Sequence, residues 1–255
     1  MATVYFNINY EFDHDTVLRR IDEAVQSGTL GYVCVADGVI LNLVDRIPDY
    51  SKVVAGAMFS ICDSAYTPLY LRWLYCLRLT NYTGSELFAD IVAMKRYRMM
   101  FLGAKRDILD ALRLKLVAID PRIADMRFVE LPFLSVDEFD YEAIARSVEA
   151  DRPDIIWVSL GAPKQEIFMS RLQPHLHRGV MIAVGAAFKF HSGKGERRAP
   201  QWMLDHRLEF LFRIWQSPRK QLNRCAWIVR TLPGLLWREW RSKKRVRSSS
   251  GGQTT

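Results

Sequence analysis

Short apolar or β-branched runs alternate with longer stretches of helical periodicity through most of the chain. This alternation is typical of a parallel sheet covered by helices, because parallel strands need long crossover connections. The pattern predicts strands near residues 4–8, 32–35, 58–62, 98–102, 127–131, 154–159 and 180–184. It predicts helices near residues 15–26, 50–57, 84–95, 105–117, 141–150 and 163–175. We therefore expect an α/β fold with a Rossmann-like, mostly parallel sheet flanked by helices.

The strand pattern stops near residue 200. Residues 202–241 are predicted to form helical hairpins, with breaks at Ser217-Pro218 and Pro233-Gly234. The last eight residues are mostly small and polar. The sequence thus predicts an α/β core over residues 1–199, a helical C-terminal appendage over 200–247 and a disordered tail over 248–255.

The positive charge lies almost entirely in the appendage. Residues 197–247 contain fourteen Lys or Arg and three acids, whereas the whole chain has a net charge of +8. The rest of the chain is therefore mildly acidic. A basic end on an acidic body indicates an anionic partner that binds that end, such as lipid, nucleic acid or a phosphorylated substrate.

Tryptophans alternate with arginines in this basic end, which favours a membrane surface over nucleic acid. The expected membrane contacts are Trp227, Arg230, Trp237 and Trp240. The longest apolar stretch, residues 225–240, is interrupted by Arg230, Pro233 and Gly234 and is too short to span a bilayer. The first fifteen residues lack the pattern of a signal peptide, and the four cysteines form no Cys-x-x-Cys pair. We expect a peripheral protein at the cytoplasmic membrane face.

Two predicted strand-to-helix junctions suit phosphate contact. One runs through Gly103 to Lys105, and the other through Gly161 and Pro163 to Lys164. Free N–H groups and the helix dipole can hold a diphosphate at such places, although ordinary turns look the same in sequence. Neither junction has the glycine spacing of a dinucleotide or Walker loop.

Acidic residues follow two other strands. Asp63 could cap a helix or act in catalysis, and Asp37-Gly38 reads most simply as a turn. Asp13-His14-Asp15 resembles a metal-binding pair, but its position before a helix favours capping. We assign no metal ligands and expect no cofactor.

Several motifs in a fixed order resemble the WecG/TagA/CpsF glycosyltransferase family. They are residues 83–87 (TGSEL), 101–103 (FLG), 160–166 (LGAPKQE), 184–188 (VGAAF), 198–203 (RAPQWM) and 208–213 (LEFLFR). The resemblance covers roughly residues 32–224. Family members are inverting enzymes that move a sugar from a UDP-sugar to a polyprenyl-diphosphate-linked sugar at the cytoplasmic membrane face.

The resemblance implies roles for individual residues. Asp63 matches the family's catalytic aspartate in its distance from the Thr-Gly motif, and Gln165 would orient a substrate. Arginines of the appendage, Arg213, Arg219 and Arg224, would bind diphosphate. The motifs also imply donor or acceptor contacts from Thr83, Gly84, Glu86, Gly103, Lys105, Gly161, Pro163, Lys164, Glu166, Gly185 and Phe188.

This chain departs from the family pattern in two places. Cys62-Asp63-Ser64 replaces Pro-Asp-Gly, and Val35-Ala36-Asp37 replaces a Thr-x-Asn motif implied in donor contact. These changes favour glucose as the donor sugar, as in the GumM branch that serves exopolysaccharide synthesis. The alternative is an N-acetylmannosamine-type transferase.

The expected partners are a UDP-sugar, a polyprenyl-diphosphate-linked sugar and an anionic membrane, without nucleic acid; a homo-oligomer stays open. Two other classes remain as alternatives. An NAD(P)-dependent oxidoreductase lacks its glycine fingerprint here, and a non-catalytic membrane scaffold would keep the fold without the reaction.

Overall fold

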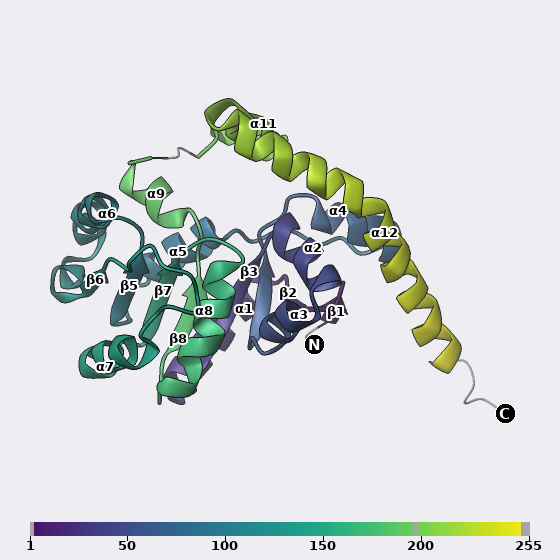
Figure 1. The fold of residues 1–255 in the computed structure, drawn as a ribbon. Coiled ribbons are helices and arrows are strands. Elements are labelled where there is room, and N and C mark those ends of the chain that lie inside the picture. Colours follow the sequence, from purple (N-terminus) through teal and green to yellow (C-terminus); the bar gives the residue numbers. More distant parts are fainter. Residues whose placement is uncertain (1–2, 196–197, 251–255) are drawn as a thin grey trace.

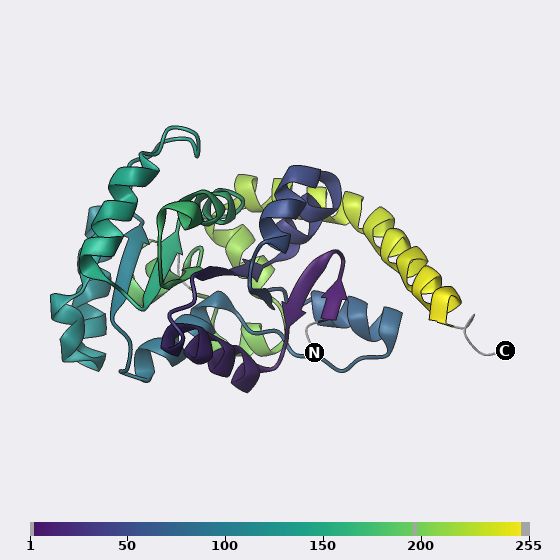
Figure 2. The same ribbon diagram turned by 90° about the horizontal axis from the view of Figure 1, so that it is seen from below.

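A computed structural model describes residues 3–195 and 198–250 (Figures 1 and 2). Eight strands form one sheet in the order β1-β2-β4-β3-β8-β7-β5-β6. Their bounds are β1 Thr3–Tyr5, β2 Ile8–Glu11, β3 Gly31–Ala36, β4 Phe59–Cys62, β5 Met99–Gly103, β6 Arg127–Val129, β7 Ile155–Ser159 and β8 Val180–Ala183. Every neighbouring pair is parallel except the β1–β2 hairpin. The predicted α/β fold is confirmed.

Helices cover both faces of the sheet (Figure 1). Alternate residues of each central strand point to opposite faces, so Val33 and Val35 enter one core and Tyr32 and Cys34 the other. The first core is closed by α1 (His14–Gln26), α5 (Gly84–Ala93), α6 (Arg106–Ile119) and α9 (Ala187–Ser192). The second is closed by α7 (Tyr141–Asp151) and α8 (Lys164–Leu172).

A third core lies between the N-terminal hairpin and four helices. These helices are α2 (Gly38–Arg46), α3 (Pro48–Ala55), α4 (Thr67–Tyr75) and α12 (Pro218–Ser250). The sequence analysis did not predict α2 or α9, and it expected a helix after Asp63 without giving its bounds; this helix is α4, whose N-cap is Tyr66 and not Asp63. Contiguous apolar residues hide the helical period in α2, while α4 carries apolar residues on its exposed side as well as its buried side. Short helical segments α10 (Gln201–Asp205) and α11 (Glu209–Gln216), and 3₁₀ turns at Pro121–Asp125 and Gln173–His175, complete the described chain.

Two predictions of local structure were wrong. The single strand expected near residues 4–8 is a hairpin, because Phe6 and Asn7 adopt left-handed backbone angles and turn the chain. The helix break expected at Pro233-Gly234 is absent, and α12 runs unbroken through it. Pro233 lies on the exposed side, while Thr231 and Leu235 on the opposite side are buried against the body of the protein. Packing on both sides of the proline therefore compensates for its missing N–H.

The break expected at Ser217-Pro218 is confirmed, since α11 ends at Gln216 and α12 begins at Pro218. In the predicted tail, α12 continues to Ser250 and residues 251–255 lie outside the described residues. The boundary proposed between core and appendage stays a prediction.

Polar contacts hold α12 along the body of the protein. Arg224, Thr231 and Arg238 pair with Asp37, Asn42 and Asp45, which are the N-cap and two residues of α2. Farther along, the buried Glu239 accepts hydrogen bonds from the backbone N–H of Phe6 (2.9 Å) and from the hydroxyl of Tyr75 (2.6 Å). Glu239 thereby joins α12 to the hairpin and to the end of α4.

We expect Glu239→Ala to lower the free energy of unfolding by about 1–3 kcal/mol, because it leaves a buried donor, the Phe6 N–H, and a part-buried donor, the Tyr75 hydroxyl, without their acceptor. Urea denaturation followed by circular dichroism measures this. Glu142→Ala removes an exposed glutamate from α7 and is the matched control, with an expected change below about 0.5 kcal/mol. Equal urea midpoints for the two variants would contradict the role of Glu239 in joining α12 to the hairpin and to α4.

Candidate active site

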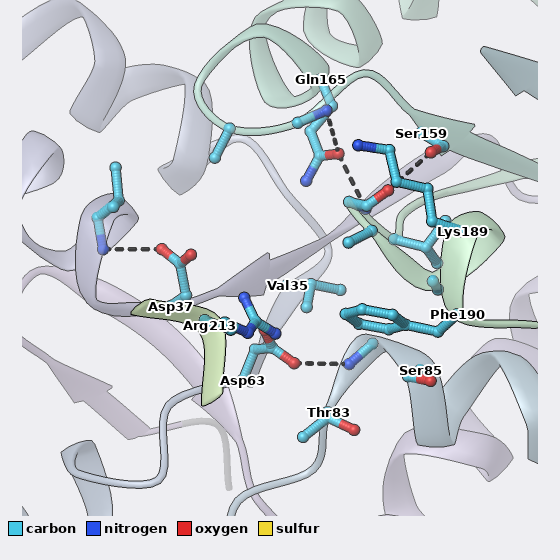
Figure 3. A pocket seen from close by; sticks show the side chains of 18 of the residues that line it. Val35, Asp37, Asp63, Thr83, Ser85, Ser159, Gln165, Lys189, Phe190 and Arg213 are labelled. Atoms are coloured by element: carbon cyan, nitrogen blue, oxygen red, sulfur yellow. Dashed lines mark hydrogen bonds between the residues drawn. The ribbon is translucent and has the colours of Figure 1, made fainter. Parts of the chain in front are cut away.

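A cavity of about 340 Å³ opens at the carboxyl edge of the central strands. Residues that follow β3, β4, β7 and β8 form its floor, and α11 and α12 contribute Glu209, Arg213, Gln221 and Arg224 to its wall. Figure 3 shows side chains from these segments pointing into one space. In open α/β sheets ligands gather at this edge, which makes the cavity the candidate site.

Two carboxylates project into the cavity from neighbouring strands. Because Ala36 pairs with Cys62 in the parallel register, the residues that follow them, Asp37 and Asp63, leave the sheet side by side. Asp37 accepts hydrogen bonds from Val39 N–H (2.7 Å) and Ile40 N–H (3.0 Å) and pairs with Arg224. Asp37 is therefore both the N-cap of α2 and an anchor for α12.

Asp63 accepts a hydrogen bond from the N–H of Gly84 (2.9 Å), the first residue of α5. Burial of the carboxyl group, followed by the negative charge of Asp37, raises the pKa of Asp63 to about 7. The Gly84 N–H and the charge of Arg213 act in the opposite direction. A carboxylate with this pKa can take up a proton near neutral pH, as a general base must.

Arg213 lies beside Asp63 in Figure 3. Its guanidinium donates to Glu209 at 2.9 and 2.6 Å and lies 5.6 Å from the centre of the Phe190 ring. The negative charges of Glu209 and Asp63 raise its pKa, although burial alone would lower it. The arginine therefore places a fixed positive charge at the cavity, next to the carboxylate pair.

Gln165 links two glycine turns at the cavity floor. Its side-chain oxygen accepts from the N–H groups of Gly161 and Gly185, both at 3.1 Å. Both glycines have positive φ angles, which a side chain would strain. The side-chain nitrogen donates to Glu166 (2.8 Å), whose other oxygen accepts from the hydroxyl of Tyr50 (3.1 Å). Glu166 is fully buried, and this burial raises its pKa to about 7.

A model of the WecG/TagA/CpsF glycosyltransferase family matches residues 5–249. The chain belongs to this family. The resemblance seen in the motifs is confirmed and extends over nearly the whole described chain, so the oxidoreductase alternative has no support.

Curated relatives give further detail. A Bacillus subtilis protein is 27% identical over 173 residues, which cover 67% of this chain and 65% of that protein. A Staphylococcus aureus protein is 20% identical over 250 residues, covering 95% and 94% of the two chains. Both relatives carry the name N-acetylglucosaminyldiphosphoundecaprenol N-acetyl-beta-D-mannosaminyltransferase.

In this family member the cavity brings together eight of the residues that the sequence predicted. They are Asp63, Thr83, Gly84, Gly161, Gln165, Gly185, Arg213 and Arg224. The other predicted site residues do not line the cavity. Glu166 lies behind Gln165, Phe188 lies in the core, and Glu86 caps α5 with Thr83 and pairs with Arg198 (3.0 Å).

The remaining predicted residues occupy the turns or the outer surface. Gly103 packs against the backbone of Ser159, and Pro163 is the N-cap of α8 rather than its first residue. Lys164 turns away to the carbonyl of Leu134. Lys105 and Arg219 are exposed. These positions leave Lys105, Lys164 and Arg219 without contact to the cavity.

Several cavity residues were not assigned to the site from the sequence: Asp37, which was read most simply as a turn, and Ser85, Ser159, Lys189, Phe190 and Arg198. Asp37 had a usable signal, because it directly follows a buried strand next to that of Asp63. Lys189 and Phe190 sit on α9, a helix of only six residues without a clear period. Among the described residues, no group of three His, Cys, Asp or Glu side chains is placed to hold a metal ion. Asp13 caps α1 by accepting from Thr16 N–H (2.8 Å).

We expect Asp63→Asn to stabilise the protein more at pH 8 than at pH 5. The folded-state pKa of Asp63, about 7, lies above the value of about 3.9 in an unfolded chain. Its contribution to stability is therefore present at low pH and is lost as the pH rises through 7. Asparagine keeps the acceptor for Gly84 N–H but does not ionise. Melting temperatures of both proteins at the two pH values test this, and an equal difference at pH 5 and pH 8 would contradict it.

Proposed function

We propose that this protein transfers N-acetylmannosamine from a UDP-activated donor to N-acetylglucosaminyl-diphosphate-polyprenol, with inversion at the anomeric carbon. The observation that carries the proposal is Asp63, a carboxylate with a raised pKa between a helix N-terminus and Arg213. The names of the two relatives support this donor sugar and acceptor better than the glucose favoured from the sequence.

Asp63 would act as the base. As a hydroxyl of the acceptor sugar attacks the anomeric carbon, its proton moves to the Asp63 carboxylate, and the bond from that carbon to the UDP oxygen breaks. The departing UDP takes the bonding electrons. A base with a pKa near 7 is suited to this step, because it is substantially ionised at neutral pH and still binds a proton well enough to remove it.

Positive groups around the cavity would stabilise the charge on UDP. The N-terminus of α5 lies at the cavity and contributes the positive end of its helix dipole, because the Gly84 N–H itself is bonded to Asp63, and Arg213 and Arg224 stand at the cavity wall. Each arginine is already held by a carboxylate, Glu209 or Asp37. Arginine forks match the paired oxygens of a diphosphate, so these side chains need little rearrangement to bind it.

Gln165 would position the donor through the two glycine turns that it ties together. Its oxygen is fully used by Gly161 and Gly185, and its nitrogen is oriented by the buried Glu166. Glu166 therefore supports the site from behind and has no direct access to substrate. The donor contact that the motif implied for Glu166 is therefore replaced by a positioning role.

The lipid-linked acceptor calls for a position at the membrane surface, and we propose the cytoplasmic face. No helix in the described ranges is long and apolar enough to cross a bilayer. Of the four predicted membrane contacts, Arg230, Trp237 and Trp240 are exposed on α12, whereas Trp227 is half-buried. Arg241 stacks on the Trp237 ring at 3.6 Å, a pairing that suits the headgroup region.

Purified protein should release UDP and extend the lipid when given UDP-N-acetylmannosamine and N-acetylglucosaminyl-diphosphate-polyprenol. UDP-glucose and UDP-N-acetylglucosamine serve as competing donors, and mass spectrometry of the lipid identifies the product. Asp63→Asn is the matched inactive control and should lower turnover by at least about a hundredfold, the usual contribution of a general base. Transfer of glucose alone would restore the first donor hypothesis. Absence of transfer with every donor would favour a non-catalytic scaffold.

We expect EDTA to leave the reaction rate largely unchanged, because arginines and helix N-termini supply the positive charge for UDP. Arg213→Lys keeps the charge but loses the two-pronged geometry, and it should reduce turnover by roughly tenfold or more. Arg219→Lys, at an exposed position away from the cavity, is the control. A strict requirement for added Mg²⁺ or Mn²⁺ would contradict this assignment of the leaving-group charge.

A further inference from the structure

Helix α4 displays an unusual exposed face. Leu69 and Trp73 lie four residues apart on one side of the helix, and Tyr66 and Cys76 flank them as the N-cap and C-cap residues of α4; all four are exposed. Trp73 has 72% of its surface exposed. On the opposite side, Leu71 and Leu74 are buried in the third core. The buried inner face is sufficient to hold α4 against the body of the protein. The outer apolar stripe is therefore not needed for the packing of this helix.

Helix α12 carries a similar stripe. Leu222, Val229, Pro233 and Trp240 recur at spacings of seven, four and seven residues and are all exposed. The residues of α12 that bind α2, such as Thr231 and Arg238, lie on the opposite side of the helix. Glu239 and Lys243, which contact Tyr75 and Leu74 at the end of α4, lie between the two sides. The stripe on α12 therefore faces the flank of the molecule to which α4 belongs.

Helix α11 connects the two stripes. The Tyr66 hydroxyl donates to the carbonyl of Arg207 (3.0 Å), and its ring meets Phe210 edge-on at 6.2 Å. Phe210, Leu211 and Trp215 of α11 are themselves exposed. Since α11 also contributes Glu209 and Arg213 to the cavity wall, the apolar flank begins beside the candidate active site.

The exposed charges of this flank are positive, because its two acids are engaged: Glu209 accepts from Arg213, and Glu239 is buried. Residues 64–85 contain Arg72 and Arg78 and no acid, and residues 210–238 contain no acid either. Arg72, Arg78 and Arg230 are exposed. An apolar surface with exposed tryptophan and tyrosine, bordered only by arginine, is complementary to an anionic lipid surface.

We propose that α4 is a second membrane-docking element, which enters the headgroup region of an anionic bilayer together with α11 and α12. The same surface would then serve two functions. It holds the protein on the membrane. It also brings the bilayer close to the candidate active site, because α4 and its N-cap Tyr66 follow Asp63 by only three residues. The inference adds a docking element to the proposed function, but it concerns lipid binding in the absence of either sugar substrate.

The test compares two double variants of the full chain, each losing one leucine and one aromatic side chain. Leu69→Ser/Trp73→Ser alters the α4 stripe, and Leu114→Ser/Phe133→Ser alters exposed residues on α6 and on the loop before α7. Partition onto vesicles of phosphatidylglycerol and phosphatidylcholine is measured by co-sedimentation, without sugar donor or acceptor. We expect the α4 variant to bind on the order of tenfold more weakly than wild type and the control variant to bind normally.

Cys76 offers a direct second measurement, because it is exposed at the end of the stripe. In a Cys225→Ser background the two other cysteines are buried, so an environment-sensitive fluorophore can be attached at Cys76. Adding the anionic vesicles should shift its emission to the blue and protect it from iodide. A label that stays exposed to iodide while the protein sediments with the vesicles would overturn the proposal.

Two further outcomes would also overturn it. Equal loss of vesicle binding in both double variants would show that α4 has no special part. Unchanged vesicle binding with a shift from oligomer to monomer in light scattering, confined to the α4 variant, would show that a second copy of the chain covers the stripe. Absence of sugar transfer by the wild-type protein, together with vesicle binding that the α4 variant loses, would count against the proposed function and leave the docking surface standing.

Discussion

Asp37 and Asp63 lie side by side because the register of β3 and β4 allows no other arrangement. Two negative charges at the end of a buried sheet repel each other, and burial makes the repulsion stronger. The surrounding groups offset the negative charge of each carboxylate. Asp37 receives two N–H groups of α2 and the guanidinium of Arg224, while Asp63 receives the N–H of Gly84 and the nearby charge of Arg213. Among the described residues Asp63 forms no direct ion pair, so burial and the charge of Asp37 keep its pKa raised.

The same constraint explains why the basic C-terminal segment belongs to the site as well as to the surface. Arg213 and Arg224 come from α11 and α12, which the chain reaches only after the last strand. Their partners Glu209 and Asp37 hold them at the cavity, and the contacts of Thr231, Arg238 and Glu239 fix the rest of α12. A movement of α12 would therefore change the charges around Asp63. If α12 contacts the membrane as proposed, that contact is physically connected to the electrostatics of the cavity.

The sequence predicted the parts of the fold that depend on local periodicity. The central strands and the helices α1, α5, α6, α7 and α8 follow from apolar spacing, and the capping box of Thr83 and Glu86 marks the start of α5 in the sequence itself. Features set by tertiary packing could not be predicted in this way. Pro233 signals a break that packing at Thr231 and Leu235 overrides, and the apolar outer face of α4 conceals its helical period.

The candidate site shows the same division. Asp63 and the glycine turns were found through motifs, whereas Lys105, Lys164 and Glu86 were included for their place in a motif and do not line the cavity. Sequence spacing gives the order of residues along a turn but not the direction of a long side chain. The direction depends on neighbours that are remote in sequence, such as Leu134 for Lys164 and Arg198 for Glu86.

Asp37 stands at the position that the sequence analysis matched to the asparagine of a Thr-x-Asn motif. An asparagine could still cap α2, but it would carry no charge, so it could neither raise the pKa of Asp63 nor form an ion pair with Arg224. The aspartate therefore does two things at once: it makes the neighbouring base more basic, and it draws an arginine of α12 to the cavity wall. Its carboxylate would repel a diphosphate if it stood alone, and Arg224 removes that repulsion. Compared with an asparagine, Asp37 thus adds one negative charge beside Asp63 and one ion pair with Arg224, and it thereby sets the charge balance of the cavity.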